Sequence, residues 1–241
     1  MTLDGKAVLI TGASRGLGAA LSRQLAAAGA RLVLVARARE PLQRLANELR
    51  EQGAEAHALS ADIGDKTAIH PLASAAAELV GPIDVLIHNA SSLGPTPLRL
   101  LVDTECEDLE RVLAVNLVGP FRLSRIIAGS MAVRGGGTLL HLSSDAAVSA
   151  YPRWGAYSVS KAALDHLSRL WAVELEPHGV RVLAVDPGDM DTELHAAAVP
   201  DADRAALADP SDVARRIVAL LSEARVPSGA RVEAARYEVA S

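Results

Sequence analysis

Short apolar segments alternate with longer amphipathic segments along this chain. The apolar segments are rich in Val, Leu and Ile, and they cover residues 7–10, 32–35, 55–59, 85–87, 138–142 and 180–185. Their near-continuous hydrophobicity is typical of parallel strands that are buried on both faces. Strands and helices in alternation, joined by short links, predict right-handed crossovers. The expected fold class is α/β, a doubly wound parallel sheet of about seven strands with helices on both faces.

Turn-forming and capping residues mark the ends of the predicted helices. Gly29 and Gly53 are expected to end the first two helices. Thr104 and Glu107 have the spacing of a capping box that opens a long helical segment, and Pro210 is expected to open the last helix.

The length of 241 residues lies within the range of one large α/β domain, so we predict a single domain over residues 1–241. Residues 91–103, which contain Gly94, Pro95 and Pro97, are predicted to form a loop over the functional site. Only 2% of the residues are aromatic, so the core must consist mainly of Ala, Val, Leu and Ile.

Charge and the N-terminal sequence exclude several kinds of partner. The net charge is −5 with no basic stripe, so nucleic acid is not an expected partner. No charged n-region with a long apolar stretch follows Met1, and no apolar run approaches membrane-spanning length. We therefore expect a cytoplasmic protein with no membrane partner. The single Cys106, beside Glu105 and Glu107, is expected to be a buried or inert thiol.

A glycine-rich turn follows the first strand. Gly12, Gly16 and Gly18 allow backbone N–H groups and a positive helix terminus to face a pyrophosphate without obstruction by a Cβ atom, and Ser14 and Leu17 belong to the same turn. The spacing differs from the usual G-x-G-x-x-G fingerprint, and a simple tight connection is the alternative interpretation. The turn predicts a dinucleotide site in a Rossmann-like sheet.

Two arginines bear on the choice of dinucleotide. The second strand ends at Val35 and is followed by Ala36 and Arg37, with no carboxylate where an acidic residue would hold a ribose 2′-hydroxyl, and Arg15 lies inside the glycine turn. Both arginines can grip a 2′-phosphate, which favours NADP (NADPH) over NAD. The alternative is that each is a solvated surface charge.

Four further residues that follow predicted strands are candidates for cofactor binding. Asp62 either accepts a hydrogen bond from an adenine amino group or caps a helix, and Ile63 is its neighbour. Asn89, which precedes Ala90, either pins neighbouring loops through its side chain or makes a turn. We expect Asn89 to be supportive rather than chemical.

A tyrosine and a lysine four residues apart share one helix face. The Lys161 ammonium is expected to lower the pKa of Tyr157 by favouring phenolate. Tyr157 can then give a proton to a carbonyl that is reduced by hydride, and Ser144 can give its oxygen a fixed hydrogen bond. Lys161 would also hold the ribose. Taken alone, this spacing is usually a solvated helix face, and only its context favours chemistry.

A proline provides part of that context. Asn116 lies inside a predicted helix, and Pro120, four residues later, has no N–H to bond the Asn116 carbonyl. An ordered water leading toward Lys161 would satisfy this carbonyl and extend a proton relay. The alternative is a plain proline kink with solvent at the break.

These residues together resemble the short-chain dehydrogenase/reductase family, in its short single-domain branch, over nearly the whole chain. Ser144 stands thirteen residues before Tyr157, which is the family's usual interval. The motifs that carry the resemblance are, in chain order, Thr11-Gly12 with Gly16 and Gly18, Asn89-Ala90, Asn116, Ser144, Tyr157 with Lys161, and Pro187-Gly188.

The resemblance implies roles for several residues. Pro187, Gly188 and Thr192 would border the nicotinamide, with Thr192 reaching its carboxamide, and Arg15 and Arg37 would mark an NADP-preferring member. The helices that begin near residues 104 and 155 would remain available for a homodimer or homotetramer. The implied catalytic tetrad is Asn116, Ser144, Tyr157 and Lys161.

The chain departs from the family pattern in three places. Ser91 replaces the glycine that usually follows Asn89 and Ala90. Residues 189–208, which form a lid over the substrate in the family, are short and lack aromatic residues, so we expect a more open pocket. The charged tail, residues 230–238, puts the tetramer contacts of relatives in doubt.

Two functions follow. The first is an NADP(H)-dependent oxidoreductase that interconverts a ketone or aldehyde and an alcohol by hydride transfer, with Tyr157 as general acid and base. The second is a catalytically silent NADP-binding regulatory or sensor protein of the same fold. Such relatives commonly lose the tyrosine or the lysine, and this chain keeps both. An epimerase or dehydratase of the longer branch does not fit, because that branch carries a larger C-terminal substrate domain.

Overall fold

The computed structural model describes residues 2–223 and 225–237 and contains one seven-stranded parallel sheet. The strand order is β3-β2-β1-β4-β5-β6-β7, so the chain builds one half of the sheet outward from β1 and then returns to build the other half. The predicted doubly wound α/β fold is therefore confirmed. The strands are β1 (Ala7–Thr11), β2 (Arg31–Ala36), β3 (Ala56–Ser60), β4 (Val85–His88), β5 (Gly137–Leu142), β6 (Val180–Asp186) and β7 (Arg231–Glu233).

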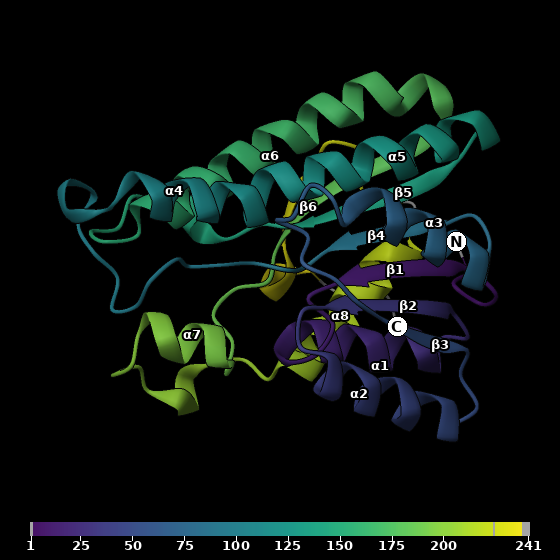
Figure 1. Ribbon diagram of the computed structural model, residues 1–241, viewed down its shortest axis with the longest axis horizontal. Helices are drawn as coiled ribbons and strands as arrows, with labels where there is room; N and C mark the ends of the chain where they lie inside the picture. The colour runs from purple at the N-terminus through teal and green to yellow at the C-terminus, as the bar shows by residue number, and fades with distance from the viewer. Residues whose placement is uncertain (1, 224, 238–241) are drawn as a thin grey trace.

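Helices cover both faces of the sheet (Figure 1). Helices α1, α2 and α8 lie on one face, and α3, α4, α5 and α6 lie on the other, while the short α7 projects beyond the sheet edge. Their bounds are α1 (Gly16–Ala27), α2 (Arg39–Glu51), α3 (Ile69–Val80), α4 (Cys106–Leu113), α5 (Gly119–Arg134), α6 (Gly155–Leu175), α7 (Glu193–Ala198) and α8 (Pro210–Ser222).

The apolar runs of the sequence divide between the two faces as strand geometry requires. In β1, Val8 and Ile10 pack in the core under α1 and α8, whereas Ala7 and Leu9 pack in the core on the opposite face. All four side chains are completely buried. A continuous apolar strand, rather than an alternating one, follows directly from burial on both faces.

Most of the predicted helix boundaries are confirmed. Gly29 and Gly53 follow the ends of α1 and α2 with φ of 80° and 90°, the left-handed conformation that ends helices. Pro210 opens α8. The predicted capping box is wrong, because Glu105 occupies the N-cap of α4 without a side-chain bond, and the Thr104 hydroxyl donates to the Leu100 carbonyl instead.

Two expectations about residues near α4 have different outcomes. Residues 91–103 form the predicted loop, with a short 3-10 turn at its end. Cys106, the first residue of α4, is exposed, so the first of the two predicted alternatives, a buried thiol, is wrong, and the second, an inert thiol, stays a prediction.

Among the residues that the structure describes, one helical stretch is long and apolar enough to cross a membrane. It is Cys106–Arg134, with a mean hydropathy of 1.3 in its most apolar window, and 44% of that window is buried inside the protein. Within it, Leu123, Ile127 and Met131 pack into the core against the sheet, which gives the stretch the character of a core helix.

Leu86 on β4 lies at the centre of the sheet and is completely buried. Replacing Leu86 with Ala is expected to lower the free energy of unfolding by about 2–5 kcal/mol, because it removes buried apolar atoms and leaves a cavity. The same truncation at Val102, which is 88% exposed in the loop before α4, should change it by less than about 0.5 kcal/mol. Urea unfolding followed by circular dichroism measures both, and equal effects would contradict the assigned core.

Candidate active site

A groove of about 820 Å³ runs along the carboxyl edge of the strands, where ligands bind in doubly wound sheets. Its walls combine the glycine turn, the ends of the central strands, the start of α6 and the segment that leads into α7. Gly188, Asn116 and Ser144 are predicted site residues outside this lining. The predicted residues that line it are Gly12, Ser14, Arg15, Gly16, Leu17, Gly18, Arg37, Asp62, Ile63, Asn89, Ala90, Tyr157, Lys161, Pro187 and Thr192.

The glycine turn leaves no room for side chains. A Cβ atom on Gly18 would lie 2.1 Å from the Gly12 carbonyl oxygen, and one on Gly12 would lie 2.7 Å from the Ala90 Cα atom. Gly12 and Gly16 also have positive φ, at 67° and 51°. The turn therefore presents bare backbone at the start of α1, which fits the close approach of a pyrophosphate.

Asn89 and Thr11 lock this turn to the adjoining strand. The Asn89 side-chain amide donates to the carbonyl oxygens of Thr11 and Gly12, each at 3.0 Å, and the Thr11 hydroxyl accepts from the N–H groups of Asn89 and Ala90 at 3.1 Å. The pinning role predicted for Asn89 is confirmed. Thr11 was missed as a structural partner, although its place at the end of the first strand made it a candidate.

Both predicted 2′-phosphate ligands line the groove, each beside a carboxylate. Arg15, at the N-cap of α1, bonds the Glu193 carboxylate of α7, and the side chains are about two-thirds exposed or more. Arg37 Nη1 lies 3.9 Å from Asp62 Oδ2. These exposed ion pairs are weak and screened by solvent, so an incoming phosphate can exchange with them.

Asp62 and Thr192 already make local hydrogen bonds. Asp62 Oδ1 accepts from the Gly64 N–H at 2.8 Å in a turn, and α3 begins only at Ile69 with Ala68 as N-cap, so the helix-cap alternative for Asp62 is wrong. The Thr192 hydroxyl accepts from the His195 N–H at 3.2 Å and caps α7.

Tyr157 and Lys161 lie on one face of α6, as predicted, and both are buried. Lys161 Nζ donates to the Leu142 carbonyl at 2.7 Å and lies 5.5 Å from the centre of the Tyr157 ring. Burial raises the pKa of Tyr157 to about 12, against hydrogen bonds with Ser144 and Ser91 that lower it. The predicted lowering is wrong, because loss of hydration outweighs the other influences on this phenol.

The same burial acts on the lysine in the opposite sense. It lowers the pKa of Lys161 to about 8, although the nearby carboxylates of Asp165 and Asp186 raise it. Lys161 can therefore change its protonation state close to neutral pH, which a solvated lysine cannot do.

Ser144 lies in the turn that follows β5. Its hydroxyl donates to Asp145 Oδ1 at 3.0 Å and accepts from the Ala146 N–H at 3.2 Å, and it also hydrogen-bonds with Tyr157. The Tyr151 hydroxyl donates to the other oxygen of Asp145 at 2.8 Å. The structure therefore brings Ser144 and Tyr157 together. The contacts of the neighbouring Asp145 carboxylate could not be predicted from the sequence.

Asn116 lies at the centre of a π-helical turn, Ala114–Val118, that joins α4 to α5. The Gly119 N–H donates to the Ala114 carbonyl five residues earlier, just before Pro120, which has no N–H to donate. The Asn116 side chain accepts from the Ser92 N–H at 2.8 Å and donates to Ser160 Oγ at 2.9 Å, so it ties the loop to α6. The proton relay through its carbonyl stays a prediction.

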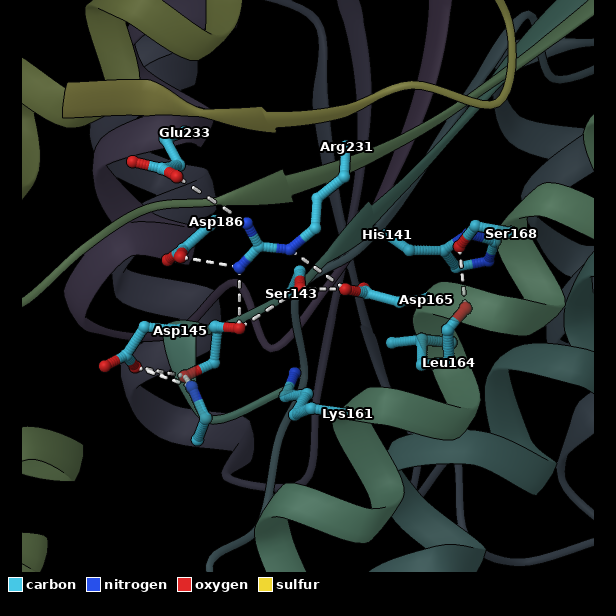
Figure 2. A network of polar contacts seen from close by, with 12 residues as sticks. His141, Ser143, Asp145, Lys161, Leu164, Asp165, Ser168, Asp186, Arg231 and Glu233 are labelled. Atoms are coloured by element: carbon cyan, nitrogen blue, oxygen red, sulfur yellow. Dashed lines mark hydrogen bonds and ion pairs between the residues drawn. The ribbon is translucent and has the colours of Figure 1, made fainter. Parts of the chain in front are cut away.

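A buried charge cluster beneath these residues was missed. Arg231 of β7 contacts Asp165 of α6 and Asp186 of β6 (Figure 2). Asp165 lies four residues after Lys161 on the same helix, and this spacing could have predicted that the two side chains share one helix face. Nothing in the sequence pointed to Arg231.

Comparison with known proteins agrees with this geometry. The sequence profile described as short chain dehydrogenase matches residues 6–203. Over 233 residues the chain is 31% identical to the 7alpha-hydroxysteroid dehydrogenase of Escherichia coli strain K12, and the match covers 93% of this chain and 90% of that protein.

Solved structures share the whole fold. A 7 alpha-hydroxysteroid dehydrogenase complexed with NADH and 7-oxo glycochenodeoxycholic acid superposes with a TM-score of 0.89, at 28% identity, over 99% of this chain and 97% of that one. A metagenomic short-chain oxidoreductase in complex with NADP gives 0.82, at 31% identity, over 97% of both chains. Both nicotinamide cofactors therefore occur among similar structures. This chain belongs to the short-chain dehydrogenase family of oxidoreductases.

Proposed function

We propose that this protein is an NADP(H)-dependent oxidoreductase that interconverts a ketone or aldehyde and the corresponding alcohol. The observation that carries this proposal is the buried Tyr157, which is hydrogen-bonded with Ser144, lies close to Lys161 and lines the same groove as the glycine turn. The glycine turn fits a pyrophosphate, and a carbonyl is a group that such a tyrosine can protonate.

The residues that line the groove fit a nicotinamide dinucleotide. The glycine turn would hold the pyrophosphate at the start of α1, Asp62 and Ile63 would border the adenine, and Lys161 would hold the nicotinamide ribose. Pro187, Gly188 and Thr192 would border the nicotinamide ring. When bound, the cofactor supplies or accepts the hydride.

The side chains of the site would manage the proton. With a pKa of about 12, Tyr157 carries its proton at neutral pH, which is the state that a proton donor to a carbonyl oxygen requires. Ser144 would hydrogen-bond the same oxygen as negative charge develops on it. Lys161 and the backbone at Asn116 would return a proton to Tyr157 after each turnover.

Apolar side chains surround the ring of Tyr157 and suit a substrate with an apolar frame. Leu93, Leu98, Trp154 and Leu194 cluster with the tyrosine ring, and Trp154 meets that ring edge-on at 5.6 Å. The similar proteins include dehydrogenases of hydroxysteroids, which are alcohols on an apolar frame. The proposed partner is therefore a small-molecule alcohol or carbonyl compound.

The proposal extends to organisation and location. We propose that residues 1–241 act as one catalytic domain in the cytoplasm and that the protein is a homodimer or homotetramer. Large apolar side chains exposed on α5 and α6, among them Val133 at 90% and Val173 at 74% exposure, support self-association, because burying them would be favourable.

Replacing Tyr157 with Phe tests the chemistry. Turnover should fall by roughly a hundredfold or more, because the proton donor is lost, whereas NADPH binding should change little. NADPH oxidation with a panel of ketones, diketones, quinones and aldehydes measures turnover, and cofactor fluorescence measures binding. Tyr237→Phe, outside the groove, is the matched control. Undiminished turnover in Tyr157→Phe would contradict the proposed role of the tyrosine. If the wild-type protein bound NADPH but turned over none of the substrates, the sensor function would be favoured.

Replacing Gly18 with Ala tests the cofactor site. The new methyl group would overlap the Gly12 carbonyl, so NADPH affinity should fall by roughly tenfold or more and stability by about 1–3 kcal/mol. Gly129→Ala is the control, because a Cβ atom there has no neighbour within 4 Å and the residue lies in α5. The NADPH affinity of Gly129→Ala, measured by cofactor fluorescence, should equal that of the wild-type protein. An undiminished NADPH affinity of Gly18→Ala would mean that the dinucleotide binds elsewhere.

Replacing Arg37 with Met tests the preference for NADPH. The KM for NADPH should rise roughly tenfold, because a charged hydrogen bond to the 2′-phosphate is lost, and the KM for NADH should hardly change. Arg44→Met, on the exposed face of α2 and paired with Glu40, should change neither. A parallel rise for both cofactors would show that Arg37 does not read the 2′-phosphate.

A further inference from the structure

Arg231 makes polar contacts with three separate elements beneath the active site. Its Nη2 atom donates to the Ser144 carbonyl oxygen and to Asp186 Oδ2, each at 2.8 Å, and its Nε atom donates to Asp165 Oδ2 at 3.0 Å. Figure 2 shows the guanidinium between these groups, with Glu233 at its outer side. The planar fork of an arginine suits such simultaneous contacts.

Each of these contacts leads to a residue of the proposed site. Asp165 Oδ2 also accepts from the Ser143 hydroxyl at 2.8 Å, and Asp165 lies on α6 one turn after Lys161. Asp186 Oδ1 accepts from the Gly188 N–H at 3.0 Å, in the turn that would border the nicotinamide. One guanidinium therefore connects the serine turn, the lysine helix and the turn after β6.

The charges within the cluster balance. The side chains of Asp165 and Asp186 are only 9% and 8% exposed, and buried carboxylates need cations to compensate for lost hydration. Two cations face them, because both carboxylates act electrostatically on Lys161 as well as on Arg231. Removing Arg231 would leave Lys161 as the cation of two buried carboxylates.

We propose that Arg231 is a positioning residue that holds Ser144, the helix of Lys161 and the Pro187–Gly188 turn in one geometry and that it keeps the Asp165 carboxylate beneath them ionised. This inference rests on the proposed function for its effect on turnover, but its effect on Asp165 does not. Arg231 itself lies on β7, outside the lining of the groove, and acts through its neighbours.

The effect of Arg231 on Asp165 has a definite sign. A cation favours the ionised form of a carboxylate that it contacts, so losing Arg231 should raise the pKa of Asp165, which burial already raises. Losing the Asp165 carboxylate should in turn lower the pKa of Lys161. The buried His88 and His141 rings, stacked at 4.9 Å, cannot replace the lost charge, because burial lowers the pKa of both and keeps them neutral. The charged groups that face Asp165 are Lys161 on the same helix and Arg231 on β7. The titratable groups that face Lys161 are Tyr157 and Asp165 on α6, His88 on β4, His141 on β5 and Asp186 on β6.

The chain contains only three lysines, Lys6, Lys66 and Lys161, so the Lys161 pKa can be measured directly. In protein labelled with ¹³C at lysine Cε, the NMR titration of Lys161 should shift downward by roughly half a unit or more in Asp165→Asn. In protein labelled with ¹³C at the aspartate carboxyl carbon, the Asp165 signal is identified by its loss in Asp165→Asn. Its titration should shift upward in Arg231→Met and stay close to wild type in Arg231→Lys, which keeps the charge. Arg236→Met, an exposed arginine next to the same strand and paired with Glu233, is the control and should show no shift.

Turnover tests the positioning. Arg231→Met should lower kcat by roughly ten- to a hundredfold with NADPH affinity changed far less, and Arg231→Lys should lower kcat by a smaller factor, because a single ammonium cannot reproduce the fork. A normal kcat in both variants would overturn the positioning role, and an unchanged Asp165 titration in Arg231→Met would overturn the electrostatic one. If Arg231→Met does not fold, the Asp165→Asn shift and the Arg231→Lys kcat decide the matter. If the wild-type protein turned over none of the substrates, the proposed function would be refuted, but the titration results would still hold.

Discussion

Parallel pairing of the strands is the constraint on which the rest of this structure depends. Because β1, β4, β5 and β6 run in the same direction, their carboxyl ends meet at one edge of the sheet. The groups that follow those strands therefore gather in space from distant parts of the sequence. The glycine turn, Asn89, Ser144 and Pro187 are such groups, and each begins where a strand ends.

This arrangement exposes strand ends and buries polar groups, and the structure compensates for several of them. Asn89 and Thr11 satisfy the backbone where the glycine turn leaves β1. Arg231 pairs with the buried carboxylates behind Ser144 and Lys161. A site that depends on the relative positions of its side chains needs a base that holds them in place, so the supporting contacts matter to the proposed function as much as the lining does.

Sequence predicted what depends on local spacing and missed what depends on tertiary contact. The strands, the doubly wound sheet and the shared face of Tyr157 and Lys161 follow from periodicity, and the structure has all of them. The direction of the Tyr157 pKa was wrong because spacing gives proximity along a helix but not the burial that removes water from the phenol. The contact of Arg231 with Asp165 joins residues 66 positions apart, and no local pattern encodes such a pair.

The central claim is that the carbonyl carbon of a substrate receives a hydride beside Tyr157. The measurement that tests it most directly is the fate of deuterium in turnover with NADPH labelled at C4 of the nicotinamide, followed by mass spectrometry of the alcohol product. The account predicts that one of the two C4 positions delivers its deuterium to the product carbon and the other retains it. Alcohol product that carries no deuterium from either labelled cofactor would contradict the account.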